Sequence, residues 1–311
     1  MKRALLGLSH TPLLGLNPLQ PDVDAALRGA LTEAARHVRE FAPDLVIIVA
    51  PDHFNGFFHD LMPPFCVGTR AEAVGDYGTP AGPLNVPAEE ALALASSITD
   101  SGIDVAVSRR MSVDHGFSQP LQLLFGSLDS PPVVPIFINA AAPPAIPKVA
   151  RCVALGRALG HHFAADTRRI LVLGSGGLSH DPPIPTLDHP DPGVRERITI
   201  RNRLTAEQRA ARQEHVIAAG KAMAAGNSDR RQLNPVWDRK FMDWLEAGDW
   251  SSIEALREGE IVREGGGSAH EVKTWIAAFA SSDAGTLSTR LRWYRDIPEL
   301  IAGFGILFRA S

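Results

Sequence analysis

The chain has 311 residues, of which 45% are hydrophobic and 21% charged, and its net charge is −4 with a pI near 6.3. This is an ordinary globular composition with ample material for a core. There is no long basic run and no window of about 18 apolar residues, so we expect neither nucleic acid nor membrane as a partner. With no signal peptide and only two cysteines, we expect a cytoplasmic protein without a disulfide framework.

Three apolar runs lead to a histidine: residues 4–8 before His10, 45–50 before His53, and 170–173 before the turn that ends at His180. An unbroken apolar run rich in β-branched residues is typical of a strand buried on both faces of a parallel sheet. The carboxyl ends of such strands meet at one edge, where open α/β sheets bind ligands. One histidine after a strand is most often a satisfied loop residue, but three in the same relation favour a shared site.

Helices are predicted between these strands, where apolar residues recur at helical spacing. We predict helices over 22–41, 88–100 and 149–163, and further strands over 103–107 and 133–138. Residues 60–82 are rich in glycine and proline and are predicted to be irregular loop. The alternation of elements predicts an α/β fold with a mostly parallel central sheet flanked by helices on both faces.

The composition changes at residue 181, where a proline-rich loop leads into charged segments predicted to be helical over 194–225 and 237–247. Ser268 and Glu271 have the spacing of a capping box and predict a helix that carries Glu271 in its first turn. We interpret residues 1–180 as the sheet portion and 181–311 as a more helical extension of the same single domain, 1–311.

The C-terminal stretch, residues 293–308, is apolar and is expected to dock on the core. Together with the extra helices it offers more surface than one sheet needs, so we expect a homo-oligomer. The apolar residues on which this expectation rests are Trp293, Ile297, Leu300, Ile301 and Phe304.

Four histidines lie at turns: His10, His53, His115 and His180. Two histidines and one carboxylate form a facial triad that leaves positions open on non-haem Fe(II) for a substrate and O2. Residue chemistry alone does not choose among the nearby carboxylates, which are Asp52, Asp114, Asp181 and Glu271. Zinc hydrolysis would use the same ligand types. Ser175 lies in a glycine-rich turn without a P-loop lysine, and we interpret it as a turn serine and not a nucleophile.

Seven segments resemble the class III (LigB-type) extradiol ring-cleaving dioxygenases: GLSHTPL at 7–13, APDHFNGFF at 50–58, VDHGF at 113–117, GSGGLSH at 174–180, LNPVWD at 233–238, HEVKTW at 270–275 and IAGFG at 301–305. The resemblance runs nearly end to end and is weakest over about 185–225. It implies an oxidoreductase of aromatic catabolism that opens the ring of a catecholic aromatic acid with O2.

The resemblance also implies roles for single residues. His10, His53 and Glu271 would bind Fe(II), His180 would be the base that removes a phenolic proton, and His115 would be the acid in the later rearrangement. Two alternatives remain open: a zinc-dependent hydrolase or oxidoreductase on the same scaffold, and a non-catalytic subunit of a dioxygenase. A basic residue is expected to bind the carboxylate of the substrate, but several arginines compete for that role.

Overall fold

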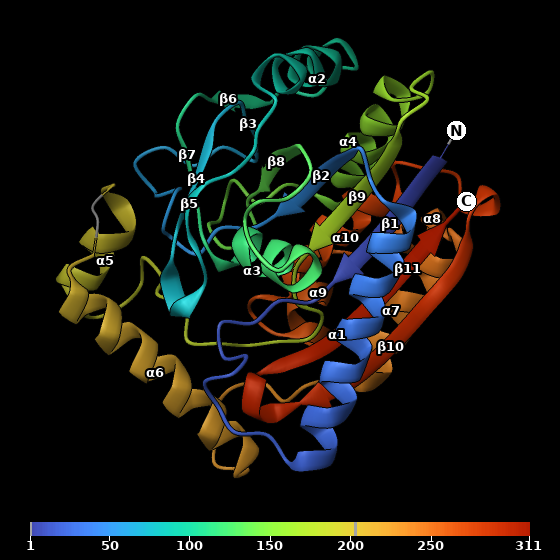
Figure 1. Ribbon diagram of the computed structural model, residues 1–311. Helices are drawn as coiled ribbons and strands as arrows, with labels where there is room; N and C mark the ends of the chain where they lie inside the picture. The colour runs from blue at the N-terminus through green and yellow to red at the C-terminus, as the bar shows by residue number, and fades with distance from the viewer. Residues whose placement is uncertain (1, 202–203) are drawn as a thin grey trace.

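An eight-stranded sheet forms the centre of the protein, for which a computed structural model describes residues 2–201 and 204–311 (Figure 1). The strand order is β10-β11-β1-β9-β2-β8-β3-β6. Its four central strands pair in parallel: β1 (Lys2–Leu8), β9 (Arg169–Ser175), β2 (Leu45–Ala50) and β8 (Val133–Ile138). These strands confirm the predicted mostly parallel centre.

Shorter or antiparallel strands complete this sheet and form a second one. β3 (Phe65–Gly68) and β6 (Ala106–Ser108) extend the main sheet beyond β8. The small sheet consists of β4 (Ala71–Val74), β5 (Ala81–Pro83) and β7 (Met111–Val113). The prediction of irregular loop over 60–82 is therefore wrong. These strands have only three or four residues, too few to show a period, and distant partners stabilise them.

The C-terminal stretch is also part of the main sheet and does not merely dock on it. β10 (Ser288–Ile297) pairs with β11 (Ala302–Ala310), and β11 pairs antiparallel with β1. Four of the five apolar residues on which the homo-oligomer expectation rested are buried within the chain, and Trp293 is half-buried. They provide little free apolar surface, so self-association stays a prediction without this support.

Helices cover both faces of the sheet (Figure 1). The α-helices of the described chain are α1 (Pro21–Phe41), α2 (Ala88–Asp100), α3 (His115–Phe125), α4 (Val149–His162), α5 (Pro192–Thr199), α6 (Ala206–Ala224), α7 (Pro235–Ala247), α8 (Trp250–Ala255), α9 (Glu258–Gly265) and α10 (Val272–Phe279). Helix α3 was not predicted because Gly116 and Pro120 interrupt its pattern. The side chain of Asp114 caps its first turn by accepting the Gly116 N–H.

Side chains of β2 alternate between two apolar cores, with Leu45, Ile47 and Val49 in one and Val46, Ile48 and Ala50 in the other. The first core contains α2, α4 and α10, and the second contains α1 and α3. Because both faces are buried, the strand is apolar throughout, which explains its unbroken pattern. Polar residues follow only where these central strands end, and the candidate site lies there.

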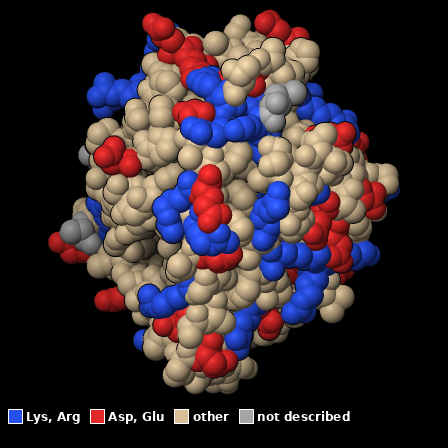
Figure 2. All heavy atoms as spheres, turned by 45° about the vertical axis from the view of Figure 1, so that its right-hand side comes forward, with Lys and Arg blue, Asp and Glu red and all other residues tan. Residues whose placement is uncertain are grey.

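The surface shows no segregation of charge on the face drawn in Figure 2, where basic and acidic side chains are interspersed. No helix in the described part of the chain combines the length and apolar character that a bilayer crossing requires.

Candidate active site

The carboxyl ends of three neighbouring strands bring three histidines to one edge of the sheet. His10 follows β1, His53 follows β2, and His180 follows β9, which lies between these two strands. Each apolar run gives way to polar residues, glycine or proline, so the backbone leaves the sheet and the histidine lies beyond the strand. The convergence predicted from the sequence is present.

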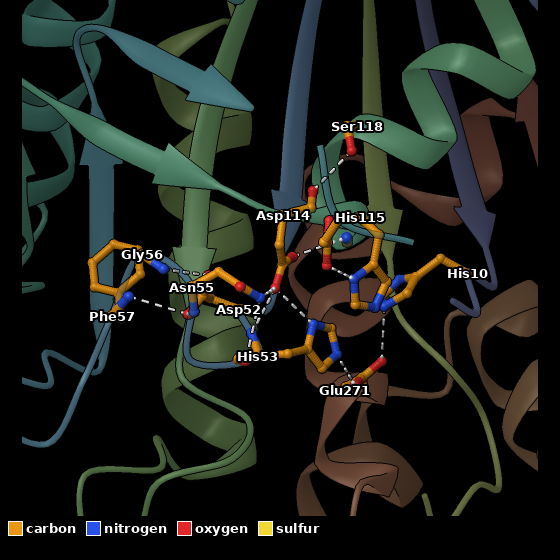
Figure 3. Close-up of polar contacts among 12 residues, drawn as sticks. His10, Asp52, His53, Asn55, Gly56, Phe57, Asp114, His115, Ser118 and Glu271 are labelled. Carbon is orange, nitrogen blue, oxygen red and sulfur yellow. Dashed lines mark hydrogen bonds and ion pairs between the residues drawn. The ribbon is translucent and has the colours of Figure 1, made fainter. Parts of the chain in front are cut away.

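His115 joins this group from the first residue of α3. Its ring is stacked on that of His53, with 4.4 Å between centroids, and both rings lie 5.4 Å from the ring of His10. Figure 3 shows these three rings gathered above the carboxylate of Glu271. All three are buried.

Glu271 supplies the carboxylate that faces the histidines. It ends a short 3-10 helix, Ala269–Glu271, that runs into α10. Its carboxylate oxygens lie 3.2 Å from Nε2 of His53, 3.2 Å from Nε2 of His180 and 3.6 Å from Nε2 of His10. The Gly177 N–H donates to it over 2.8 Å.

The predicted capping box at Ser268 is wrong, because the Ser268 side chain forms no capping hydrogen bond. Its backbone has helical angles (φ −97°, ψ −2°), whereas a capping residue is normally extended. Glu271 cannot turn back to cap the helix because its carboxylate is engaged with the histidines.

The other three carboxylates considered from the sequence face elsewhere. Asp52 accepts three backbone N–H groups of the loop at residues 55–57. Asp114 binds the far side of the His53 ring, and Asp181 accepts the N–H groups of Gly267 and Arg231. Of these four carboxylates, Glu271 is the one directed at the Nε2 atoms.

Each of the four histidines has its Nδ1 atom held by a protein group. The partners are the Ser175 hydroxyl for His10 (2.9 Å), Asp114 for His53 (3.0 Å), Asp76 for His115 (2.5 Å) and the Leu178 carbonyl for His180 (2.9 Å). Such contacts fix the orientation of a ring and turn Nε2 toward the site. The sequence analysis did not select Asp76 as a site residue. Ser175, interpreted there as a turn serine, holds the ring of His10 in place.

Burial and charge shift the proton affinities of this cluster. Burial lowers the pKa of His10 to about 3, against the opposing charge of Glu271. Burial also opposes protonation of His53 and His180, but acidic neighbours outweigh it and raise both pKa values. The pKa of Glu271 lies well below its usual range, because the histidines outweigh the effect of burial. The site therefore holds a carboxylate anion among imidazoles.

A cavity of about 570 Å³, including its open mouth, lies against this cluster. The four histidines and Glu271 form its polar end. Apolar side chains line the remaining wall, among them Leu13, Ile184, Val216, Leu300 and Ile301. Tyr77 and Arg212, which sequence reasoning did not select, also line it.

The residues present suit a divalent metal ion. The Nε2 atoms of His10, His53 and His180 lie within 3.6 Å of one carboxylate, and each imidazole is oriented through its other nitrogen. The donor atoms of His115 also lie within 4.8 Å of those of His10 and His53. Nε2 of His115 is buried without a hydrogen-bond partner among the described residues, so it too is directed at this space.

An open α/β sheet with a cluster of imidazoles and a carboxylate at the ends of its strands is typical of a metalloenzyme. Comparison with known families narrows this class. The family described as "Catalytic LigB subunit of aromatic ring-opening dioxygenase" matches residues 4–305. The chain belongs to this family. It is an extradiol dioxygenase, and its expected substrates are a catechol and O2.

Two relatives illustrate the similarity. A 2,3-dihydroxyphenylpropionate/2,3-dihydroxicinnamic acid 1,2-dioxygenase from Comamonas testosteroni is 53% identical over 99% of this chain and 96% of its own length. A protein of the same name from a Rhodococcus species is 50% identical over 98% of both chains. An uncharacterized protein from Escherichia coli K12 (JW3007) shares the fold, with a TM-score of 0.50 and 14% identity over 99% of this chain and 98% of its own.

Proposed function

We propose that this protein catalyses the Fe(II)-dependent extradiol cleavage of 2,3-dihydroxyphenylpropionate, 2,3-dihydroxycinnamate or both, in phenylpropanoate degradation. The observation that carries the proposal is the convergence of His10 and His53 on the carboxylate of Glu271. The names of the two relatives support the substrate. The product would be 2-hydroxy-6-oxonona-2,4-dienedioate.

His10, His53 and Glu271 would hold the iron as a facial triad. When bound, Fe(II) would coordinate both catechol oxygens and O2 and allow electron density to pass between them. Glu271 compensates the charge of the cation, which a third neutral imidazole would not do. His115 is close enough to be an alternative ligand. However, a fourth protein ligand would occupy a position that substrate or O2 requires.

His180 is suited to remove a phenolic proton. Its Nδ1 is hydrogen-bonded to the Leu178 carbonyl, which can only accept, so Nδ1 carries the proton. In the neutral ring Nε2 is then an unprotonated base, and this atom faces the site. A phenolic proton of the catechol would then pass to an atom at the polar end of the cavity.

His115 is suited to deliver a proton during ring opening. Asp76 holds the ring at Nδ1 and also accepts the His115 backbone N–H over 2.8 Å. Proton exchange is thereby confined to Nε2, the buried atom without a partner among the described residues. The stacked His53 ring keeps this atom beside the metal ligands.

We propose that residues 1–311 act as one domain, since β11 pairs with β1 and Glu271 meets histidines from the N-terminal portion. A cytoplasmic location is supported by the two cysteines, which are free and buried.

We also propose that the protein forms a homo-oligomer. Light scattering measures its mass in solution, and a monomeric mass at working concentration would reject this proposal.

Two measurements test the proposed function: the colour of the product and the incorporation of isotope-labelled oxygen into it. Fe(II)-loaded protein is mixed anaerobically with 2,3-dihydroxyphenylpropionate and then exposed to labelled O2. We expect a yellow ring-opened product that contains both labelled oxygen atoms. Zn(II)-loaded protein is the control and should give no colour. A hydrolytic product with zinc, and none with iron, would favour the zinc alternative, and no turnover with any metal would favour a non-catalytic subunit.

A further inference from the structure

Arg212 on α6 is the single lysine or arginine among the described residues that line the active-site cavity. It lies in the stretch where the family resemblance is weakest, so sequence comparison gave no reason to select it over the other arginines. The rest of the cavity beyond the histidines is mostly apolar. A ligand with an aromatic body and an anionic end would match this distribution of polarity.

The guanidinium is held close to the metal-binding end. Its Nη2 donates to the backbone carbonyl of His53 over 2.7 Å, while the His53 side chain extends to Glu271. Arg212 therefore touches the backbone of a proposed metal ligand and lines the same cavity as the histidines and Glu271.

Arg212 retains donors for a ligand. A guanidinium has five N–H donors in a planar fork, and the hydrogen bond to His53 uses one of them. Among the described residues no carboxylate forms an ion pair with it, in contrast to Arg168, which pairs with Glu90 and Asp166. A half-buried cation without an acidic partner is suited to bind a carboxylate in two-point geometry.

Tyr77 lies beside Arg212 and faces the same cavity. Its backbone has a left-handed conformation (φ 48°), which is unfavourable for a residue with a side chain. The ring packs edge-on against His115 with 5.3 Å between centroids. Burial raises the pKa of its hydroxyl, and the nearby charge of Arg212 opposes this rise. The hydroxyl is thus a neutral donor close to the guanidinium.

We propose that Arg212, assisted by the Tyr77 hydroxyl, binds the side-chain carboxylate of the catechol and makes the enzyme selective for anionic 3-substituted catechols. The inference rests on the proposed function and adds to it the residue that recognises the substrate. It also gives an orientation: the carboxylate lies at Arg212, so the diol is directed to the His10, His53 and Glu271 end.

Arg209 provides a matched control. It lies one turn earlier on α6, is exposed, and donates to the Leu204 carbonyl. It lines two neighbouring cavities and not the active-site cavity. Arg209→Met removes the same charge from the same helix without removing a group that faces the substrate.

The first experiment compares 2,3-dihydroxyphenylpropionate with 3-propylcatechol, which has a side chain of similar length without the carboxylate. In Arg212→Met, we expect the ratio of kcat/KM for the acid to that for the alkylcatechol to fall about 10- to 100-fold, the range for hydrogen bonds to a charged group. Arg212→Lys keeps the positive charge but loses the planar pair of N–H donors, so its kcat/KM ratio should fall less than that of Arg212→Met. Arg209→Met should keep the wild-type ratio.

The second experiment measures binding without metal or turnover. Metal-free protein is titrated calorimetrically with 3-phenylpropionate and with 3-phenylpropan-1-ol. We expect the wild type to prefer the acid, and Arg212→Met to lose that preference by a similar factor. Thermal unfolding of each variant verifies that it is folded.

Three results would overturn the proposal. One is an equal loss for both substrates in Arg212→Met, which would mean that Arg212 only supports the His53 loop. Another is the same ratio change in Arg209→Met, which would indicate a general charge effect. The third is a wild type without preference for the acid in either experiment. If the wild type cleaves no catechol, the proposed function fails, and the binding experiment still decides the role of Arg212.

Discussion

Asp114 accepts hydrogen bonds from both the backbone N–H and the ring Nδ1 of His53, over 2.8 and 3.0 Å. The same carboxylate accepts the Gly116 N–H at the start of α3 and the side-chain amide of Asn55. It is fully buried, and His53 and His115 outweigh the effect of burial and hold its pKa below the usual range. One anion therefore couples the orientation of His53 to the helix that begins with His115.

We expect Asp114→Asn to weaken metal binding about 10- to 100-fold, the usual range for a group that orients a metal ligand. The amide would present a donor where His53 needs an acceptor. Equilibrium dialysis with Fe(II) or Zn(II) measures the loss. Asp104→Asn, on an exposed carboxylate, is the control and should bind metal as the wild type does. Wild-type affinity in Asp114→Asn would show that the His53 ring needs no carboxylate to hold it.

His10→Ala, His53→Ala and Glu271→Ala should each lose iron, because removing one of three protein ligands weakens chelation. Elemental analysis after anaerobic reconstitution gives the metal content. Glu214→Ala, on the exposed side of α6, should retain it. If Glu271→Ala binds iron and turns over while His115→Gln loses iron, three histidines would be the ligands.

His115→Gln and His180→Gln should keep iron near the wild-type content while kcat falls about 10²- to 10⁴-fold, the contribution of a positioned acid or base. The pH profile of kcat/KM should be bell-shaped in the wild type and lose one limb in each variant. Iron-replete variants with wild-type turnover would contradict both roles.

Asp238 links the LNPVWD segment to His180 through Ser179. Its carboxylate accepts the N–H and hydroxyl of Ser179 and the hydroxyl of Tyr294. Burial raises its pKa from 3.8 to about 6. At a pH between these two pKa values, the Asp238 carboxyl is protonated more often in the folded state than in the unfolded state. The contribution of Asp238 to the free energy of unfolding therefore falls as pH rises from about 4 to about 6.

The amide introduced by Asp238→Asn does not titrate. The stability advantage of the wild type over this variant should therefore shrink between about pH 4 and about pH 7, the range over which the Asp238 carboxyl loses its proton. Urea unfolding of both proteins at the two pH values measures the difference. A stability gap that stays constant or widens with pH would contradict the raised pKa of this carboxyl.

Gly7→Ala should destabilise the fold by about 1–3 kcal/mol through overpacking. A Cβ at Gly7 would lie 2.3 Å from the ring of Trp275, which is fully buried. Gly29→Ala is the matched control: nothing lies within 4 Å of its Cβ position in α1, so the change should stabilise by about 0.5–1 kcal/mol. Urea unfolding measures both, and a neutral Gly7→Ala would mean that Trp275 can move.

The sequence by itself determined the parallel centre of the fold and the edge where the chemistry lies. The run at 45–50 is apolar throughout because both faces of β2 are covered. His10, His53 and His180 each come after such a run or the turn that follows it. These are local patterns with a direct structural meaning. The family motifs were local as well, which is why the family was recognised from the sequence.

Only the tertiary structure decided which groups meet. Glu271 is distant in sequence from His10 and His53, and no spacing rule distinguishes it from Asp52, Asp114 or Asp181. The short strands between residues 65 and 83 carry no period of their own, and partners elsewhere in the chain define them. Arg212 faces the cavity while Arg209 on the same helix does not. The direction of a side chain depends on how α6 packs, which composition and motif do not encode.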